Sequence, residues 1–292
     1  MKHNLWRPCL LLAPAAVIFL LFAYWPLLQN VWLSFHTWNM VSPVIKFAGL
    51  QNYLALLAGD ELAKVLTNTL LYIAVLLTLN FLLPYLFAFV MAHCIRSCSF
   101  FYRSALFIPS TVSLAVASIL FLWFFNPLAG PLSLILSGFG LESPRWFKEN
   151  GLVIIAIGIV IGWKVFGYNL IILLAAMNEV PRELIESARL DNASPWQIFR
   201  RIILPLTSPT ALYVFVITIV FGLQYVLVPV NMLTQGGPDQ GSTNLVYIIY
   251  QYGFVFFQTG RAAALSVLTM ALYAAFLLVK SKYLDQKVHY EN

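Results

Sequence analysis

The chain has 292 residues, of which 61% are hydrophobic and only 10% charged, and its formal net charge is +6. This composition excludes an ordinary soluble globular protein, because so many apolar side chains need a lipid environment to cover them. The positive charge is distributed as a membrane orientation signal, so it does not indicate nucleic-acid binding.

Six apolar stretches are long enough to cross a bilayer, whose hydrocarbon core of about 30 Å takes roughly 20 helical residues. They lie at about 9–29, 65–90, 104–125, 151–177, 206–230 and 261–281. Basic residues precede the first stretch as they would in a signal peptide, but Tyr24, Trp25 and Pro26 stand where a small-residue cleavage site would have to be. We expect an uncleaved first span and a single all-α transmembrane domain over residues 1–292.

Lys and Arg residues are divided unevenly between the two sides of these spans. Eleven belong to the side of the two termini: Lys2, Arg7, Arg96, Arg103, Arg182, Arg189, Arg200, Arg201, Lys280, Lys282 and Lys287. Five belong to the opposite side: Lys46, Lys64, Arg145, Lys148 and Arg261. By the positive-inside rule, we expect both termini in the cytoplasm.

Three cysteines, Cys9, Cys94 and Cys98, belong to the cytoplasmic side, where disulfides are not favoured. His93 stands beside two of them, but three loosely spaced candidates without a fourth ligand do not make a zinc site. We therefore expect no metal site.

A charged segment at about 178–205 separates the fourth and fifth spans. Pro181 and Glu183 favour a helix start, because a missing N–H costs nothing in the first turn and a negative charge there meets the positive end of the helix dipole. The pattern predicts a short helix from about 181 to 190. Asp191 and Asn192 end it, since Asn tolerates the left-handed conformation that closes helices.

A second helix is predicted to follow at once. Ser194 as N-cap, Pro195 at the first helical position and Gln197 three residues after the cap form a capping box. Apolar residues then recur at four-residue spacing, while Arg200 and Arg201 face water or lipid headgroups. The pattern leaves two interpretations open: an amphipathic linker lying on the membrane, or a docking element for another protein.

The residue string itself resembles a known motif. Glu186-Ser-Ala-x-x-Asp191-Asn-Ala193, followed by Phe199 and Ile202-x-Leu-Pro205, is similar to the EAA loop of membrane subunits of binding-protein-dependent ABC importers. In that family the short helix inserts into a cleft of a cytoplasmic ATPase and passes its closing motion to the spans. The resemblance implies ATPase-coupling roles for Glu186, Ser187, Ala188, Asp191, Asn192, Ala193 and Pro205. Ser187 replaces the family's usual Ala, a small-for-small change that should still let a partner surface approach closely. Asn192 replaces the family's usual Gly and can adopt the same backbone conformation at some cost, so the turn is expected to survive.

Further strings resemble the carbohydrate-uptake branch of these importers. They are Phe47-Ala-Gly-Leu-Gln-Asn-Tyr53, Thr234-x-Gly-Gly-Pro238 and Gly260-x-Ala262-Ala-Ala. That branch includes six-span permeases for glycerol 3-phosphate, glycerophosphodiesters and many oligosaccharides. The resemblance thus implies the type I importer permease fold and import of a sugar or a related polyol phosphate.

The same resemblance implies a set of partners in a bacterial inner membrane. They are a second, homologous permease, two copies of a cytoplasmic ATPase that uses ATP and Mg, and an extracytoplasmic solute-binding protein. The chain would bind no cofactor and catalyse no reaction, and it would form half of the translocation path.

Polar residues inside the spans are candidates to line that path. They are Lys164, Tyr168, Asn169, Gly222, Gln224 and Tyr225. A charged side chain in lipid costs roughly 2.5–3.5 kcal/mol, so Lys164 should face protein or water. It either pairs with helix carbonyls or the sister subunit, or it contacts the solute. The others either contact the solute or hold helices together.

Two other functions are less consistent with the sequence. A stand-alone secondary transporter with a proton relay would need carboxylates inside the membrane, and no Asp or Glu falls inside a predicted span. An integral membrane enzyme would need His, Asp or Cys clustered at one membrane face, and the four histidines are scattered.

Overall fold

The computed structural model describes residues 6–93 and 99–283, and the chain divides into two compact units. The first unit comprises Met1–Leu62 and Ile248–Ala274, and the second comprises Ala63–Tyr247 and Ala275–Asn292. Cys94 and Cys98 lie outside the described residues. Among the residues that are described, no three His, Cys, Asp or Glu side chains gather to hold a metal ion.

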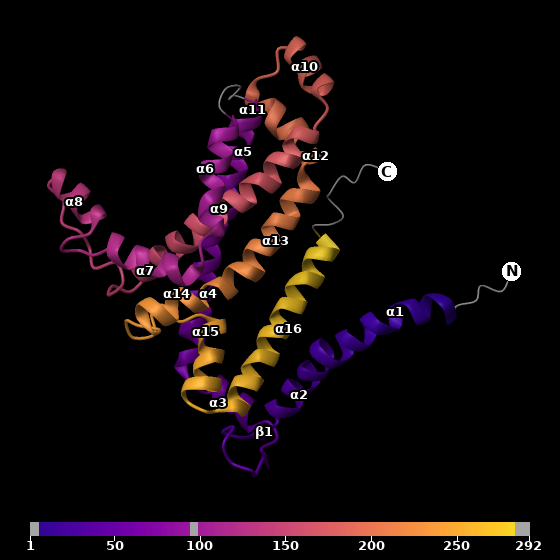
Figure 1. The fold of residues 1–292 in the computed structure, drawn as a ribbon, viewed down its shortest axis with the longest axis vertical. Coiled ribbons are helices and arrows are strands. Elements are labelled where there is room, and N and C mark those ends of the chain that lie inside the picture. The colour runs from indigo at the N-terminus through magenta and orange to yellow at the C-terminus, as the bar shows by residue number, and fades with distance from the viewer. Residues whose placement is uncertain (1–5, 94–98, 284–292) are drawn as a thin grey trace. The chain divides into compact units, whose positions relative to one another are not determined.

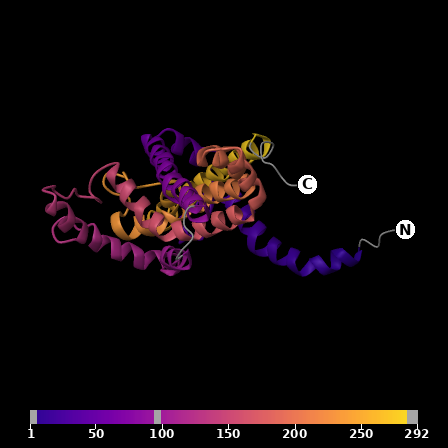
Figure 2. The ribbon, with the colours of Figure 1, turned by 90° about the horizontal axis from the view of Figure 1, so that it is seen from above.

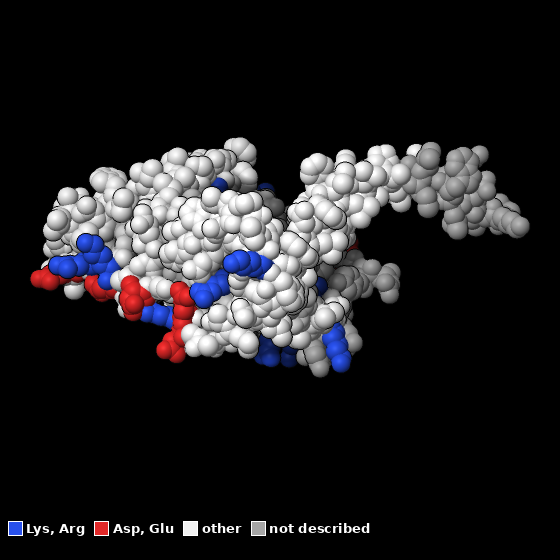
Figure 3. All heavy atoms as spheres, turned by 90° about the horizontal axis from the view of Figure 1, so that it is seen from below, with Lys and Arg blue, Asp and Glu red and all other residues white. Residues whose placement is uncertain are grey.

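The first unit opens with a long apolar helical segment. It is followed by two short antiparallel strands, in which His36 pairs with Phe47. The elements are α1 (Trp6–Phe19), a π-helical turn (Leu20–Tyr24), α2 (Trp25–Ser34), β1 (His36–Thr37), β2 (Lys46–Phe47) and α3 (Gln51–Leu57). Residues Leu11–Ser34 carry no charged side chain, and within the span only Ser34 at its end is buried in the chain (Figure 3). Its apolar surface therefore faces lipid or another subunit.

Polar contacts tie the strands of the first unit to α16 (Thr259–Tyr283) and α3. The side-chain amide of Asn52 donates to the carbonyls of Ser34 and His36 at 2.8 and 3.0 Å. A Cβ on Gly260 would lie 1.9 Å from the His36 carbonyl oxygen, so only glycine fits this approach. The Tyr252 hydroxyl donates to Glu61. Burial, together with this hydrogen bond, raises the pKa of Tyr252, which keeps the hydroxyl a donor at neutral pH.

The second unit is an assembly of helices around α9 (Figure 1). More than half of the most apolar stretch of α9 is buried. Its helices before the charged segment are α4 (Asp60–Leu77), which begins in the first unit, a π-helical turn (Thr78–Leu82), α5 (Leu83–His93), α6 (Ser99–Thr111), α7 (Leu114–Phe124), α8 (Pro131–Gly138) and α9 (Leu152–Glu179). Those that follow are α10 (Arg182–Leu190), α11 (Pro195–Ile198), a π-helical turn (Phe199–Ile203), α12 (Leu204–Leu206), α13 (Ser208–Tyr225), α14 (Leu227–Pro229), a π-helical turn (Val230–Thr234), α15 (Leu245–Tyr250) and a π-helical turn (Gln251–Val255) that lies in the first unit.

Glycines let α9 approach its neighbours closely. A Cβ on Gly158 would lie 2.4 Å from the Val75 side chain, and one on Gly162 would lie 3.1 Å from Leu79. On another face, a Cβ on Gly167 would lie 1.9 Å from the Leu106 carbonyl oxygen. Small residues four apart permit tight helix packing in membranes, where the hydrophobic effect does not drive helices together. These glycines let α9 pack against the end of α4 and the π-helical turn that follows it, and on another face against α6.

The all-α membrane fold is confirmed. Five helices in the described part of the chain are long and apolar enough to cross a membrane: Leu11–Ser34, Asp60–His93, Leu152–Glu179, Ser208–Thr234 and Thr259–Lys282. The stretch at 104–125, expected as one span, differs, because it is the pair α6 and α7, bent by 102° (Figures 1 and 2). Ser113 explains the break, since its side chain caps α7 by accepting from the Val116 N–H.

Candidate functional site

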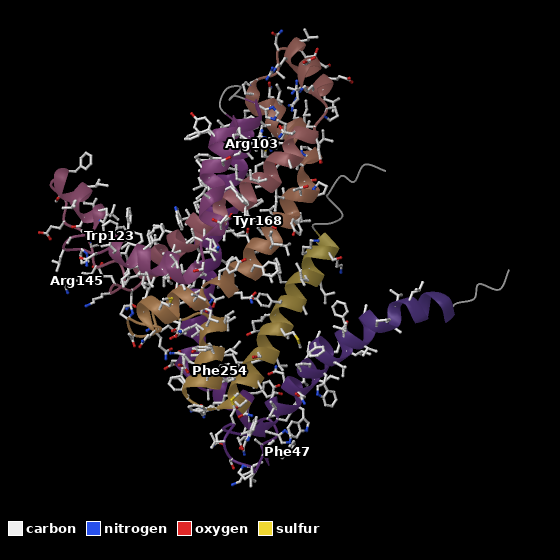
Figure 4. The ribbon with its side chains drawn as sticks, viewed as in Figure 1. Phe47, Arg103, Trp123, Arg145, Tyr168 and Phe254 are labelled. Carbon is white, nitrogen blue, oxygen red and sulfur yellow. The ribbon has the colours of Figure 1, made fainter. Side chains whose placement is uncertain are left out.

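A cavity of about 360 Å³ lies in the second unit between α6, α9, α13 and the π-helical turn at Thr78–Leu82. Five of the six path candidates line it: Lys164, Tyr168, Asn169, Gly222 and Tyr225. Tyr168 is labelled on α9 in Figure 4. Gln224 lies outside the cavity and is exposed. Successive helical residues are about 100° apart, so Gln224 points away from the face that Gly222 and Tyr225 share.

Lys164 stands at the point where α6 and α7 break apart. Its ammonium group donates to the carbonyl oxygens of Ser110 and Val112 at 2.9 and 2.5 Å. These carbonyls lie at the end of α6, where they lose their helical partners. Of the alternatives open for Lys164, pairing with helix carbonyls is the one that the structure contains. Because an ammonium group has three donors, one N–H is left for a ligand in the cavity that Lys164 also lines.

Two asparagines bring unused acceptors to the same cavity. The Asn169 amide donates to the Asn80 carbonyl oxygen and, at 3.3 Å, to the Thr218 hydroxyl. The side-chain oxygens of Asn80 and Asn169 are buried and accept no hydrogen bond from the described residues. Buried polar atoms are nearly always satisfied, so these oxygens indicate that a hydroxyl-bearing ligand or water completes the site.

Sequence reasoning missed Asn80 and Thr218. Both interrupt apolar runs, as in Thr78-Leu-Asn80 and Ile217-Thr218-Ile219, and that signal could have found them. The amide and hydroxyl side chains of these residues come from different spans, and only the fold brings them together with Asn169.

Aromatic side chains form the apolar part of the cavity wall. Tyr168, Phe221 and Tyr225 line it, and 48%, 49% and 37% of these residues is exposed in the isolated chain. Aromatic rings can stack on a sugar ring, while neighbouring oxygens that accept hydrogen bonds from the sugar hydroxyls fix its orientation. The cavity can therefore hold a small hydroxylated solute with room for one negative charge at Lys164.

The charged segment forms a second candidate site at the end of α9. The helix α10 ends as expected: Asn192 has φ 58°, and the Ala193 N–H donates to the Ala188 carbonyl at 2.9 Å. Ser194 and Gln197 form the predicted capping box, with the Ser194 N–H donating to Gln197 Oε1 at 2.7 Å. These local signals are confirmed.

The predicted coupling residues divide by exposure. Glu186, Ser187, Asp191 and Asn192 are exposed, whereas Ala188 and Ala193 are half-buried on the apolar side of the turn. Pro205, expected to begin the fifth span, is the second residue of α12, and α13 begins after a bend at Thr207. Leu190, directly before the charged turn, is 84% exposed.

One apolar core joins this segment to the spans. Ile185, Ile198, Phe199 and Ile203 are buried together with residues of α5, α9 and α13. The Phe199 ring contacts Phe89 with centroids 4.9 Å apart, Tyr85 at 5.8 Å and Trp196 at 5.2 Å. Close-packed side chains thus connect α10 and α11 to the spans.

Comparisons with known proteins agree on one family. Residues 58–290 match the model of the binding-protein-dependent transport system inner membrane component family. The chain is similar to the sn-glycerol-3-phosphate transport system permease protein UgpA of Salmonella choleraesuis (strain SC-B67), with 31% identity over 286 residues that cover 98% of this chain and 96% of the relative. UgpA of Escherichia coli (strain UTI89 / UPEC) is 30% identical over the same shares.

Solved structures share the fold. A bacterial ABC transporter involved in the import of the acidic polysaccharide alginate has a chain with a TM-score of 0.81 and 22% identity, covering 95% of this chain and 94% of its own. The alginate transporter in complex with an alginate pentasaccharide-bound periplasmic protein has a TM-score of 0.79 and 22% identity, covering 94% and 92%.

Proposed function

Because this chain belongs to the family of binding-protein-dependent transport system inner membrane components and is a permease subunit of an ABC importer, we propose that its cavity carries a sugar or a related polyol phosphate across the membrane. The observation that supports this most is the lining of the cavity. It combines two unused amide oxygens, aromatic rings and one ammonium group. Such a wall matches hydroxyls, a sugar or polyol backbone and a negative group.

Within this class, glycerol 3-phosphate or a glycerophosphodiester is the second candidate solute. Lys164 favours it, because its remaining N–H can donate to a phosphate oxygen as a charge-assisted hydrogen bond. The permeases named for glycerol 3-phosphate, at 30–31% identity, support the same choice. A neutral sugar would use the amide oxygens and the rings and leave Lys164 with its two carbonyls.

Replacement of Lys164 distinguishes these solutes. In cells that produce the complete importer, Lys164→Met and Lys164→Gln should lower uptake of glycerol 3-phosphate at least about tenfold, since hydrogen bonds to charged groups contribute about 1.5–3 kcal/mol. Uptake of a neutral disaccharide serves as the comparison, and co-purification with the partner subunits reports assembly.

The Gln variant separates recognition from structure, because its amide can still donate to the Ser110 and Val112 carbonyls. A loss confined to the phosphate in both variants supports phosphate recognition. If uptake of both solutes falls equally in Lys164→Met and is restored in Lys164→Gln, Lys164 has only a structural role at the break between α6 and α7. If the unaltered importer takes up no sugar and no polyol phosphate, the proposed solute class is wrong.

We further propose the partners and the orientation of the chain. α10 and the turn at Asp191 and Asn192 dock into a cytoplasmic ATPase, two copies of which hydrolyse ATP with Mg while a second, homologous permease completes the path. The exposed carboxylates of Glu186 and Asp191 and the exposed Leu190 support this role. A solute-binding protein delivers the solute from the other side. The alginate transporter, which shares the fold, is found in complex with an alginate pentasaccharide-bound periplasmic protein. Both termini are then cytoplasmic.

A further inference from the structure

A second, polar cavity of about 710 Å³ lies in the second unit, where the ends of α5, α6 and α9 meet α10. Three arginines line it: Arg103 from α6, and Arg182 and Arg189 from α10. Glu186 is the one carboxylate in its lining, and no ion pair joins it to these arginines within residues 6–93 and 99–283. The wall therefore carries a formal excess of two positive charges.

Two buried side-chain nitrogens in this cavity lack partners among the described residues. The Nε–H of Arg103 is a donor with no acceptor among the described residues, and Nε2 of His93, which also lines the cavity, has no partner there either. A guanidinium always carries its protons and presents a planar fork of N–H groups that fits the oxygens of a phosphate. A buried N–H of this kind indicates an oxyanion as the missing partner.

The neighbours of Arg103 place the cavity at the membrane interface. Phe100, Phe101 and Tyr102 directly precede it on α6 and are 82%, 68% and 45% exposed. Tyrosine is enriched at the headgroup level of a bilayer, so Tyr102 marks that level near the start of α6. Two spans, ending at His93 and Glu179, finish at the same place. Figure 4 labels Arg103 at this end of α6.

We propose that this cavity binds the phosphate of an anionic phospholipid headgroup, with the acyl chains lying against the exposed aromatic residues at the start of α6. Basic cavities between helix ends at the membrane surface suit such headgroups. Because Arg182 and Arg189 belong to α10, the bound lipid also ties the coupling helix to α6 and limits its movement. The site does not depend on which solute the importer carries.

The test measures lipid retained by the purified importer complex. Unaltered complex and variants are incubated with vesicles of phosphatidylcholine containing phosphatidylglycerol, repurified in mild detergent and examined by native mass spectrometry. Phosphatidylglycerol should remain bound and phosphatidylcholine should not. Arg103→Gln should lower lipid retention about tenfold. Arg103→Lys should lower it less, because lysine keeps the positive charge, but still measurably, because it lacks the planar fork of N–H groups.

Arg201→Gln is the matched control, because Arg201 is exposed on the helix that follows the turn and does not line the cavity. It should retain lipid as the unaltered complex does. Displacement of the lipid by millimolar inorganic phosphate would show a site for free anions and overturn the lipid assignment. Unchanged lipid in Arg103→Gln, with loss of the ATPase from the complex, would instead assign the cavity to an acidic segment of the partner and also overturn it.

Discussion

Asn80 has a buried side-chain oxygen in the path cavity and no hydrogen-bond donor for it among the described residues. Asn169 binds the backbone carbonyl of Asn80 and leaves the Asn80 side chain free for a ligand. Asn80→Leu should therefore lower uptake at a fixed solute concentration about tenfold, because a net hydrogen bond of roughly 1.4 kcal/mol corresponds to that factor. Thermal unfolding of the purified complex should change little, since the contact from Asn169 remains.

Thr78→Val is the control for this prediction. Thr78 lies in the same π-helical turn, is exposed, and bonds only the carbonyl of Ala74 in its own helix. It should leave uptake unchanged. If Asn80→Leu lowers the unfolding temperature in step with uptake, the side chain is structural and the cavity assignment of Asn80 is wrong.

Among the elements, the helical segment from α11 to α12 connects α10 to the spans. It is held by Phe199, which is 7% exposed, and by the hydroxyl contact between Tyr85 and Thr207 at the bend before α13. A segment packed in this way can pass a displacement to the spans, whereas a loosely packed one would absorb it.

Phe199→Ala should weaken this connection. Loss of a buried aromatic side chain costs about 3 kcal/mol of unfolding free energy and leaves a space against Tyr85 and Phe89. The exposed docking residues are untouched, so we expect the ATPase to stay bound and uptake to fall several-fold more than ATP hydrolysis. The ratio of solute moved to ATP hydrolysed in proteoliposomes measures this.

Trp196→Ala tests the specificity of that effect, because Trp196 stacks on Phe199 but is 63% exposed. It should change the ratio little. Equal loss of uptake and ATP hydrolysis in Phe199→Ala, without loss of complex, would argue that the segment does not transmit motion.

For the whole complex, charge reversal on the exposed face of α10 should separate insertion from assembly. Glu186→Lys or Asp191→Lys should leave the chain in the membrane in normal amounts, because both side chains are exposed and outside the spans. Recovery of the ATPase with the tagged chain should fall at least about tenfold, and uptake should fall with it. The reason is that the new lysine would repel basic groups of the partner, and such like-charge contacts cost several kcal/mol.

Glu183→Lys reverses a charge on the first turn of the same helix, outside the motif, and should have a much smaller effect. Normal recovery of the ATPase and normal uptake in both motif variants would remove α10 as the docking element. Loss of the chain from the membrane in these variants would instead assign the carboxylates to folding.

Residue patterns along the chain were sufficient to predict the membrane class, five of the six spans approximately, the short helix at about 181–190 and its left-handed end at Asn192. Composition, periodicity and capping act between residues a few positions apart, so they can be found without the fold. The residue string of the charged segment, together with strings near Phe47 and Thr234, also indicated the family that the comparisons show.

The cavities and the break in the third apolar stretch depend on contacts between distant segments. Asn80, Lys164 and Thr218 share a wall because α9 packs against the π-helical turn at Thr78–Leu82, α6 and α13, with glycines that permit close approach to the first two. The same packing turns Gln224 away while Gly222 faces the cavity, and it brings Arg103 beside α10. Apolar periodicity in a span cannot predict these neighbours, since lipid and protein cover a leucine equally well and only the few small or polar residues distinguish the faces.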